Sequence, residues 1–128
     1  MAEQPTRVLV VDDEPMAREL TILALEHEGF ECDPAIHGAQ ALKMLGMGRY
    51  DAVVTDLRMP ELNGHALCVE LLARPDHPVI FVVTGVTDPR LVRDLLARGV
   101  DDLFFKPVHQ KLLALKLAAQ LERKRSVH

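Results

Sequence analysis

The sequence predicts an α/β domain built on a parallel β-sheet. Short runs of β-branched and aromatic residues recur along the chain without a polar residue at every second position, which is typical of strands buried on both faces. Helical patterns fill the gaps, so that strand and helix alternate five times with short connections. This alternation favours a parallel sheet with right-handed crossovers.

The strands are expected where apolar residues are densest. Four runs predict buried strands, at residues 8–11 (VLVV), 52–54 (AVV), 79–83 (VIFVV) and 103–105 (LFF). A fifth candidate, residues 30–35 (FECDPA), alternates and contains Pro34. Because proline cannot donate a hydrogen bond to a neighbouring strand, this one is expected near an edge of the sheet.

Helices are expected between the strands, and suitable start and stop residues mark their ends. The expected helices are residues 15–28, 38–47, 64–73, 88–98 and about 108–125. Pro15 suits the first helical position, and Gly29 suits the residue that ends the same helix. Asp88 is the expected N-cap of the fourth helix, which Gly99 terminates.

The last helix carries two apolar stripes. One consists of Leu113, Leu117 and Leu121, and the other of Leu112, Leu115 and Ala119. The stripes lie roughly 120–140° apart on a helix of 3.6 residues per turn. Either one stripe faces the sheet while the other contacts a partner, such as a second copy in a homodimer through the last two helices, or both form one broad buried face.

Length, charge and apolar runs argue against a nucleic-acid-binding, membrane-spanning or secreted protein. A chain of 128 residues fits one domain, and its net charge of -4 argues against direct binding of nucleic acid or an anionic membrane surface. No apolar run approaches the roughly 20 residues that cross a bilayer, and acids near the start argue against a secretory signal, so a cytoplasmic location is expected. The cysteines, Cys32 and Cys68, are expected to be reduced thiols.

Polar side chains directly follow several of the predicted strands. In a parallel sheet, the carboxyl ends of the strands meet at one edge, where ligands bind. We therefore expect the side chains there to come together, with Asp56 at that edge and facing solvent. They are Asp12, Asp13, Asp56, Thr84 and Lys106.

This set predicts a magnesium-dependent phosphoryl site. Carboxylates brought together repel by roughly 4 kcal/mol per pair at about 4 Å, and Mg²⁺ offsets that cost because it prefers hard oxygen ligands. The six histidines are scattered, and neither HExxH nor CxxC occurs, which argues against zinc. Asp56 can then attack a phosphoryl group to form an aspartyl phosphate, whose oxygens Thr84 and Lys106 can hold.

Four motifs in this order, VLVVDDE, VVTDLRMPELNG, VVTG and FFKP, resemble the receiver domain of two-component response regulators. The resemblance extends from Arg7 to about Arg123. It implies a flavodoxin-like, doubly wound, five-stranded parallel sheet of order 2-1-3-4-5 with helices on both faces. It also implies a receiver domain over residues 1–125, with 126–128 as a tail or the start of a linker to an output domain.

The resemblance further implies a role for each site residue. Asp56 matches the phosphoacceptor, which a sensor histidine kinase or phosphotransfer protein phosphorylates. Asp13 matches a direct metal ligand, and Asp12 matches a ligand that acts largely through water. The backbone carbonyl of Arg58 matches the remaining protein ligand of the metal. Thr84 matches the hydroxyl that swings to the phosphoryl group. Such a domain is a signalling module, not an enzyme with an external substrate, although it promotes its own phosphorylation and dephosphorylation.

Lys106 matches the cation that pairs with the phosphoryl group, and its peptide bond to Pro107 is expected to be cis. Three residues earlier, Leu103 occupies a position where the family often has an aromatic residue that turns inward on activation. The usual aromatic switch is therefore not expected here. The loop after Thr84, helix 88–98 and the last strand are expected to respond to phosphorylation.

Two other classes of protein share parts of this pattern. A phosphatase of the haloacid dehalogenase type also uses an aspartate nucleophile with Mg²⁺, but its nucleophile comes first, in a DxD pattern, and its acidic pair comes last. Here the acidic pair comes first and Asp56 is followed by Leu-Arg, so this class is rejected. A phosphorylation-independent interaction module of receiver fold remains the alternative, although such modules usually lack an acid or the lysine.

Overall fold

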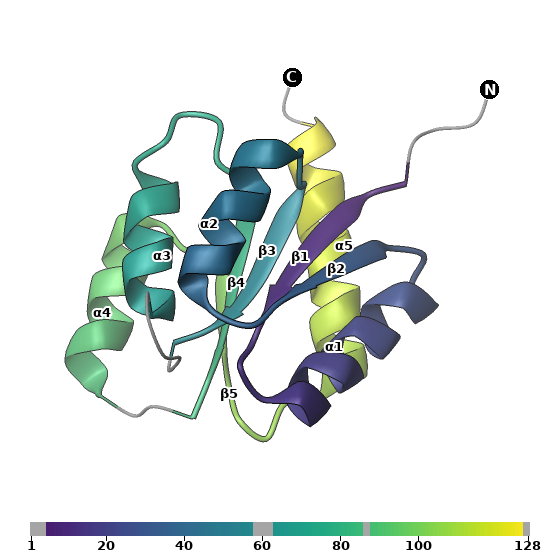
Figure 1. Cartoon of the computed structure of the whole chain (residues 1–128), viewed down its shortest axis with the longest axis horizontal. Coiled ribbons are helices and arrows are strands. Elements are labelled where there is room, and N and C mark those ends of the chain that lie inside the picture. Colours follow the sequence, from purple (N-terminus) through teal and green to yellow (C-terminus); the bar gives the residue numbers. More distant parts are fainter. Residues whose placement is uncertain (1–4, 58–62, 86–87, 127–128) are drawn as a thin grey trace.

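The chain forms a five-stranded parallel sheet in the order β2-β1-β3-β4-β5 (Figure 1), as the resemblance implies. The computed structural model describes residues 5–57, 63–85 and 88–126, and the statements below refer to these. The strands are β1 (Arg7–Val11), β2 (Glu31–Ala35), β3 (Ala52–Asp56), β4 (Val79–Thr84) and β5 (Asp102–Phe105). The strand that contains Pro34 lies at an edge, as expected.

The five helices of this described part lie close to their predicted positions. They are α1 (Pro15–His27), α2 (Gly38–Met47), α3 (Gly64–Leu72), α4 (Pro89–Arg98) and α5 (Gln110–Ser126). The Asp88 side chain caps α4, and Gly99 ends it with a left-handed φ of 98°. The last helix begins at Gln110 and not at the predicted Val108. The imidazole and the carbonyl of His109, the residue before it, accept the first backbone N–H groups of the helix.

Two separate cores cover the two faces of the sheet. On one face, residues such as Leu9, Val53 and Ile80 pack with α2, α3 and α4. On the other, Val54 and Phe81 pack with α1 and α5. Figure 1 shows this division, with α1 and α5 on one side of the strands and the other three helices opposite. The strands lack polar alternation because both of their faces are buried.

The two stripes of α5 have different environments. Leu113 and Leu117 are fully buried and Leu121 is 6 % exposed, whereas Leu112 and Leu115 are each 45 % exposed. The alternative of one broad buried face is therefore wrong. One stripe packs against the sheet, and the other faces away from it.

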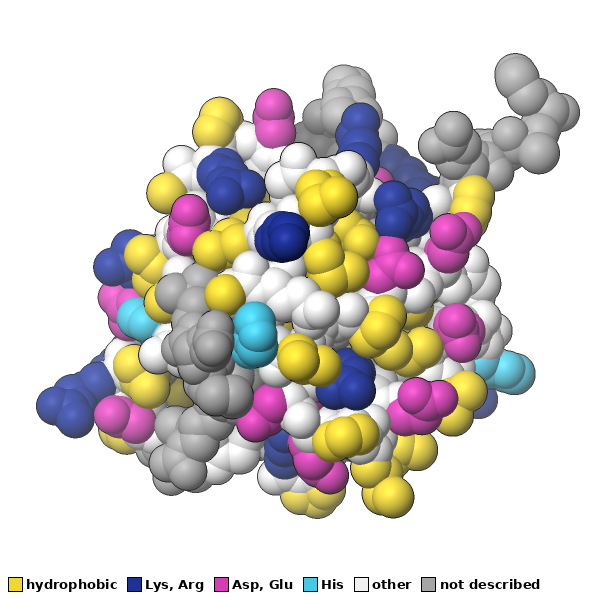
Figure 2. Space-filling view, viewed as in Figure 1, with side chains coloured by type: hydrophobic (Ala, Val, Ile, Leu, Met, Phe, Trp, Pro, Cys, Tyr) yellow, Lys and Arg dark blue, Asp and Glu magenta, His cyan; other side chains and the backbone are white. Residues whose placement is uncertain are grey.

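The surface carries charges of both signs. On the face shown in Figure 2, basic and acidic side chains are interspersed with apolar ones, so the net charge of -4 is not gathered into one acidic field there. Within the part of the chain that the structure describes, no helix has both the length and the apolar character needed to span a bilayer.

Candidate functional site

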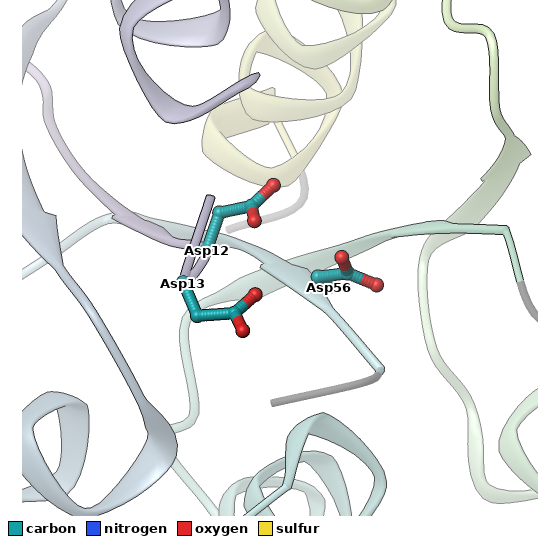
Figure 3. A group of neighbouring side chains, drawn as sticks. All are labelled: Asp12, Asp13 and Asp56. Carbon is teal, nitrogen blue, oxygen red and sulfur yellow. The ribbon is translucent and has the colours of Figure 1, made fainter. Parts of the chain in front are cut away.

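Three carboxylates meet at the carboxyl ends of β1 and β3. Val11 pairs with Thr55, so Asp12 continues the chain level with Asp56 on the neighbouring strand. One oxygen from each of Asp12, Asp13 and Asp56 lies within 4.8 Å of the other two. Figure 3 shows the three side chains gathered at this edge of the sheet. The structure thus brings together acids that lie more than forty residues apart in the sequence, as strand topology predicts.

The burial of these acids differs from the sequence-based expectation. Asp56 was expected to face solvent, but it is only 6 % exposed, and Asp12 is 7 % exposed. Asp56 is the last residue of β3, not the first residue after it, and it pairs with Val83 of β4 while Asp12 follows β1 on its other side. Asp13 alone of the three is exposed. The site therefore combines two buried acids with one exposed acid, and we call this group, together with Lys106, the acidic recess.

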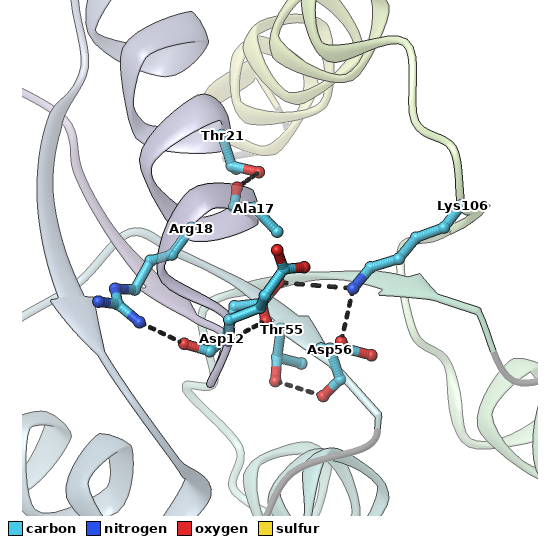
Figure 4. A network of polar contacts seen from close by, with 8 residues as sticks. Asp12, Ala17, Arg18, Thr21, Thr55, Asp56 and Lys106 are labelled. Carbon is cyan, nitrogen blue, oxygen red and sulfur yellow. Dashed lines mark hydrogen bonds and ion pairs between the residues drawn. The ribbon is translucent and has the colours of Figure 1, made fainter.

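Lys106 supplies the positive charge of the recess (Figure 4). Its Nζ atom lies 2.8 Å from Oδ2 of Asp56 and 3.7 Å from Oδ2 of Asp12. Its backbone N–H donates to the carbonyl of Thr84 at 2.9 Å, which extends the pairing of β4 and β5 by one residue. The peptide bond between Lys106 and Pro107 is cis, as the resemblance implies.

The electrostatics of the recess favour another cation. Burial raises the pKa of Asp12 above its usual value, and the hydrogen bond from Glu14 N–H and the charge of Lys106 offset this only in part. Burial acts to lower the pKa of Lys106, but its hydrogen bond to Asp56 and the nearby carboxylates outweigh that effect and raise the pKa. One ammonium therefore does not neutralise three carboxylates.

The donor set fits a magnesium ion. The three acids offer only oxygen ligands, which Mg²⁺ prefers, and the described residues around them add no thiolate or imidazole. Two ligands on opposite sides of an octahedral Mg²⁺ are about 4.2 Å apart, because each lies at roughly 2.1 Å from the ion. The observed spread of 4.8 Å is close to that value, so a small side-chain adjustment satisfies it.

Gly64 is a site residue that the sequence reasoning missed. It begins α3, and its N–H donates to the carbonyl of Leu57 at 3.1 Å. A Cβ atom at this position would overlap the backbone carbonyl of Asp56. Only glycine lets α3 begin directly against the end of β3. The Asn-Gly pair in VVTDLRMPELNG was the available signal, because Asn63 caps the helix that Gly64 begins.

The remaining predicted site residues are placed as follows. Thr84 is the last residue of β4 and is fully buried. Leu103 is partly buried and packs against the core on the side of α2, α3 and α4. Arg58 lies outside the described residues.

Two further contacts near the site have no sequence signal. The Nη1 atom of Arg18, on α1, donates to the backbone carbonyl of Asp12 at 2.8 Å. The Nε2 atom of His65, on α3, lies 2.7 Å from Oδ2 of Asp94 on α4. Both contacts join elements whose relative placement depends on the whole fold.

Comparison with known proteins places this geometry in a family. The chain is 37% identical over 117 residues to the DNA-binding response regulator MtrA of Mycolicibacterium smegmatis, which covers 91% of this chain and 51% of that protein. It is 34% identical over 119 residues to the response regulator MprA of a Mycobacterium species (strain KMS), which covers 93% of this chain and 52% of that protein. The chain thus spans about half the length of these relatives.

A solved structure and a family comparison agree with these relatives. The crystal structure of a CheY-like response regulator receiver domain protein from Methanospirillum hungatei superposes with a TM-score of 0.90 at 25% identity, covering 98% of this chain and 100% of that one. Residues 8–118 match the family described as the response regulator receiver domain. The strand order, the acidic recess with its lysine and these matches together show that the chain belongs to the response regulator receiver domain family.

Proposed function

We propose that this domain accepts a phosphoryl group on Asp56 from a sensor histidine kinase or a phosphotransfer protein. The observation that carries the proposal is the recess itself. Asp12, Asp13 and Asp56 converge within 4.8 Å, and Lys106 donates to the Asp56 carboxylate. A structural ion pair needs one acid and one base, whereas three acids around one base leave negative charge that suits a metal and a phosphoryl group.

Asp56 acts as the nucleophile. One of its carboxylate oxygens forms a bond to phosphorus while the bond from phosphorus to the donor breaks, and the donor atom keeps that electron pair and takes up a proton. No general base is needed, because a carboxylate has no proton to lose. Lys106, at 2.8 Å from Oδ2, can then pair with the transferred phosphoryl oxygens.

Asp12, Asp13 and Asp56, with the backbone carbonyl of Arg58, are the proposed ligands of Mg²⁺. Bound there, Mg²⁺ supplies charge that stabilises the phosphoryl oxygens in the transition state. The exposed side of the recess, at Asp13, leaves room for water ligands, which Mg²⁺ usually keeps.

Thr84 and Leu103 are the proposed switch residues. Thr84 is fully buried at the end of β4, and its hydroxyl is the group proposed to swing to the phosphoryl group. An aspartyl phosphate adds about -1.5 to -2 charges, which gives that movement a driving force. Leu103 is half-buried against the core on the side of α2, α3 and α4, and it lacks a ring that could turn inward. The change that accompanies the movement of Thr84 is therefore a modest repacking of Leu103.

The domain boundaries are also part of the proposal. We propose residues 1–125 as the receiver domain and 126–128 as a tail or the start of a linker, with α5 reaching one residue past that boundary, to Ser126. The domain itself is proposed to work in the cytoplasm without binding nucleic acid, although one relative is named as a DNA-binding regulator.

A homodimer through the last two helices completes the proposal. On α5, Leu112 and Leu115 are each 45 % exposed, and on α4, Leu96 is 55 % exposed. These helices cover opposite faces of the sheet next to the edge strand β5. Phosphorylation should shift sedimentation toward a dimer, and Leu115→Glu should abolish that shift. Leu20→Glu, on α1 and 51 % exposed, is the matched control.

One experiment tests the phosphoryl transfer. The protein is incubated with Mg²⁺ and acetyl phosphate, and intact mass is measured. Wild type should gain one phosphoryl group that is stable in acid and labile in base, and Asp56→Asn should not. Asp76→Asn, an exposed acid before β4, should behave as wild type. A wild type that neither gains the group nor binds Mg²⁺ is instead the phosphorylation-independent interaction module.

A further inference from the structure

The peptide group between Asp12 and Asp13 is held by a contact that comes from α1. The N–H of Asp12 donates to the carbonyl of Ala35 on β2 at 3.0 Å. The carbonyl of Asp12 accepts from Nη1 of Arg18 at 2.8 Å, and Figure 4 shows this contact beside the acidic recess. Its side-chain Oδ1 accepts from the N–H of Glu14 at 3.0 Å. Asp12 is therefore fixed at its N–H, its carbonyl and its carboxylate.

Asp13 has no such support of its own. Its side chain is exposed and makes no hydrogen bond or ion pair with any other described residue. The position of its Cα atom and the direction of its Cα–Cβ bond, from which the carboxylate extends, are therefore set by the backbone alone. That backbone begins with the peptide plane whose carbonyl oxygen Arg18 holds.

We propose that Arg18 is a positioning residue for the divalent cation. By holding the Asp12 carbonyl, it fixes the peptide plane between the two acids and aims the Asp13 carboxylate toward Asp12 and Asp56. Outer groups that orient metal ligands commonly change metal affinity by about 10- to 100-fold when they are removed. The inference rests on the proposed function in one respect, namely that Mg²⁺ binds at these three acids.

A purely electrostatic role for Arg18 makes the opposite prediction. Arg18 is a half-buried cation whose guanidinium touches the backbone of the acidic recess. Removing its charge leaves the recess more negative, which strengthens the attraction for Mg²⁺. Loss of positioning weakens Mg²⁺ binding instead. The sign of the change in affinity therefore separates the two roles.

The variants Arg18→Met and Arg18→Lys test the proposal, and Arg49→Met is the matched control. Arg49 precedes β3 at the opposite end of the sheet, so its loss changes the net charge equally without touching the recess. Mg²⁺ affinity is measured by calorimetry, and the free energy of unfolding is measured in urea without Mg²⁺. We expect Arg18→Met to weaken Mg²⁺ binding about tenfold and Arg49→Met to leave it within about twofold.

Arg18→Lys keeps the charge and one donor, so it should recover part of the affinity. It also keeps the test valid if Arg18→Met does not fold. With acetyl phosphate, the Arg18 variants should need more Mg²⁺ for half-maximal phosphorylation but reach the wild-type rate at saturation. A purely structural role would lower the free energy of unfolding without moving the Mg²⁺ requirement.

The outcomes separate this inference from the proposed function. If wild type binds Mg²⁺ and both Arg18 variants bind it equally well or more tightly, the positioning role is wrong and the phosphoacceptor function stands. If wild type binds no Mg²⁺, both proposals fail together. Weaker binding by Arg18→Met, with partial recovery in Arg18→Lys, supports the positioning role.

Discussion

At the scale of single residues, the recess works against the stability of the fold. Asp12 and Asp56 are almost fully buried at the edge of the sheet, and one lysine serves both of them. Burial raises the pKa of Asp12, so the folded chain binds that proton more tightly than the unfolded chain does. The stability that this shift contributes is therefore fully present below the pKa of the unfolded chain, and it is lost as the pH rises through the raised pKa of Asp12.

Asp12→Asn should stabilise the protein at neutral pH when Mg²⁺ is absent. The asparagine oxygen can still accept the N–H of Glu14, while the buried charge and its repulsion from Asp56 are removed. We expect the free energy of unfolding to rise by about 1 kcal/mol in urea titrations, and Mg²⁺ binding to weaken sharply. A variant that unfolds at a lower urea concentration than wild type would contradict this account of the recess.

Lys106→Met should separate metal binding from the response to phosphorylation. The ammonium pairs with Oδ2 of Asp56 at 2.8 Å and therefore competes with a cation for that oxygen. Without it, Mg²⁺ should bind about fivefold more tightly, which corresponds to ~1 kcal/mol, as measured by calorimetry. The amide spectrum of the phosphorylated variant should change less than that of wild type. Unchanged Mg²⁺ affinity would show that Lys106 does not compete for the site.

Gly64→Ala should be costly because α3 begins against the Asp56 backbone. The added Cβ overlaps the Asp56 carbonyl, and backbone cannot move aside as a flexible side chain can. A loss of about 1–3 kcal/mol in the free energy of unfolding is expected. Gly46→Ala, in α2 with nothing within 4 Å of its added Cβ, should instead gain about 0.5 kcal/mol. Equal effects of the two substitutions would rule out the close approach at Gly64.

At the scale of elements, α4 has fewer buried residues than any other helix of the described chain, so little packing attaches it to the sheet. Leu95 is its one fully buried residue among those described, and the adjacent Leu96 is 55 % exposed. A polar contact with α3 adds to this attachment: Nε2 of His65 lies 2.7 Å from Oδ2 of Asp94 on α4. The same Asp94 oxygen also accepts from Nε of Arg98 at 2.8 Å. The contact joins α4 to the helix that begins at Gly64, beside Asp56.

The attachment of α4 should therefore depend on pH. Arg98 first, and His65 second, hold the pKa of Asp94 below its usual value, so Asp94 contributes stability that is lost only in strong acid. As the pH falls through this lowered pKa, Asp94 loses its charge, and the attachment of α4 through the ion pair should weaken.

Amide hydrogen exchange in α4, corrected for intrinsic rates, measures this effect. Protection of the α4 amides should decrease in strong acid in wild type, where Asp94 becomes protonated, and should stay constant in Asp94→Asn. If both proteins show the same pH dependence, His65 does not restrain α4 through Asp94.

At the scale of the whole molecule, stability comes from two cores that the sheet separates. Each core contains residues from distant parts of the chain, and α5 contributes to only one of them. The two apolar stripes of α5 therefore play different parts. Leu117 is fully buried against the sheet, whereas Leu115 is 45 % exposed.

Alanine substitutions should show that difference directly. Leu117→Ala should cost about 2–5 kcal/mol of unfolding free energy, because it leaves a cavity in the core. Leu115→Ala should change the free energy of the monomer by less than about 0.5 kcal/mol. Urea denaturation of the unphosphorylated protein measures both values. A large cost for Leu115→Ala would mean that the second stripe is also buried.

Much of this architecture could be predicted from the sequence because it depends on local pattern. Apolar runs without alternation indicate strands buried on both faces. Pro15 and Gly99 mark helix ends through their backbone geometry, and Asp88 does so through its side-chain cap. Parallel topology then brings the carboxyl ends of the strands together. The meeting of Asp12, Asp13 and Asp56 follows from those rules alone.

Only the tertiary structure decided how these groups are surrounded. The burial of Asp56, the choice of Leu117 over Leu115 for the core, and the contacts of Arg18 with Asp12 and His65 with Asp94 were not predictable. The physical reason is that burial and side-chain contacts depend on how elements distant in sequence pack together. Local patterns specify each strand and helix, but not the distance between a side chain on one element and its partner on another.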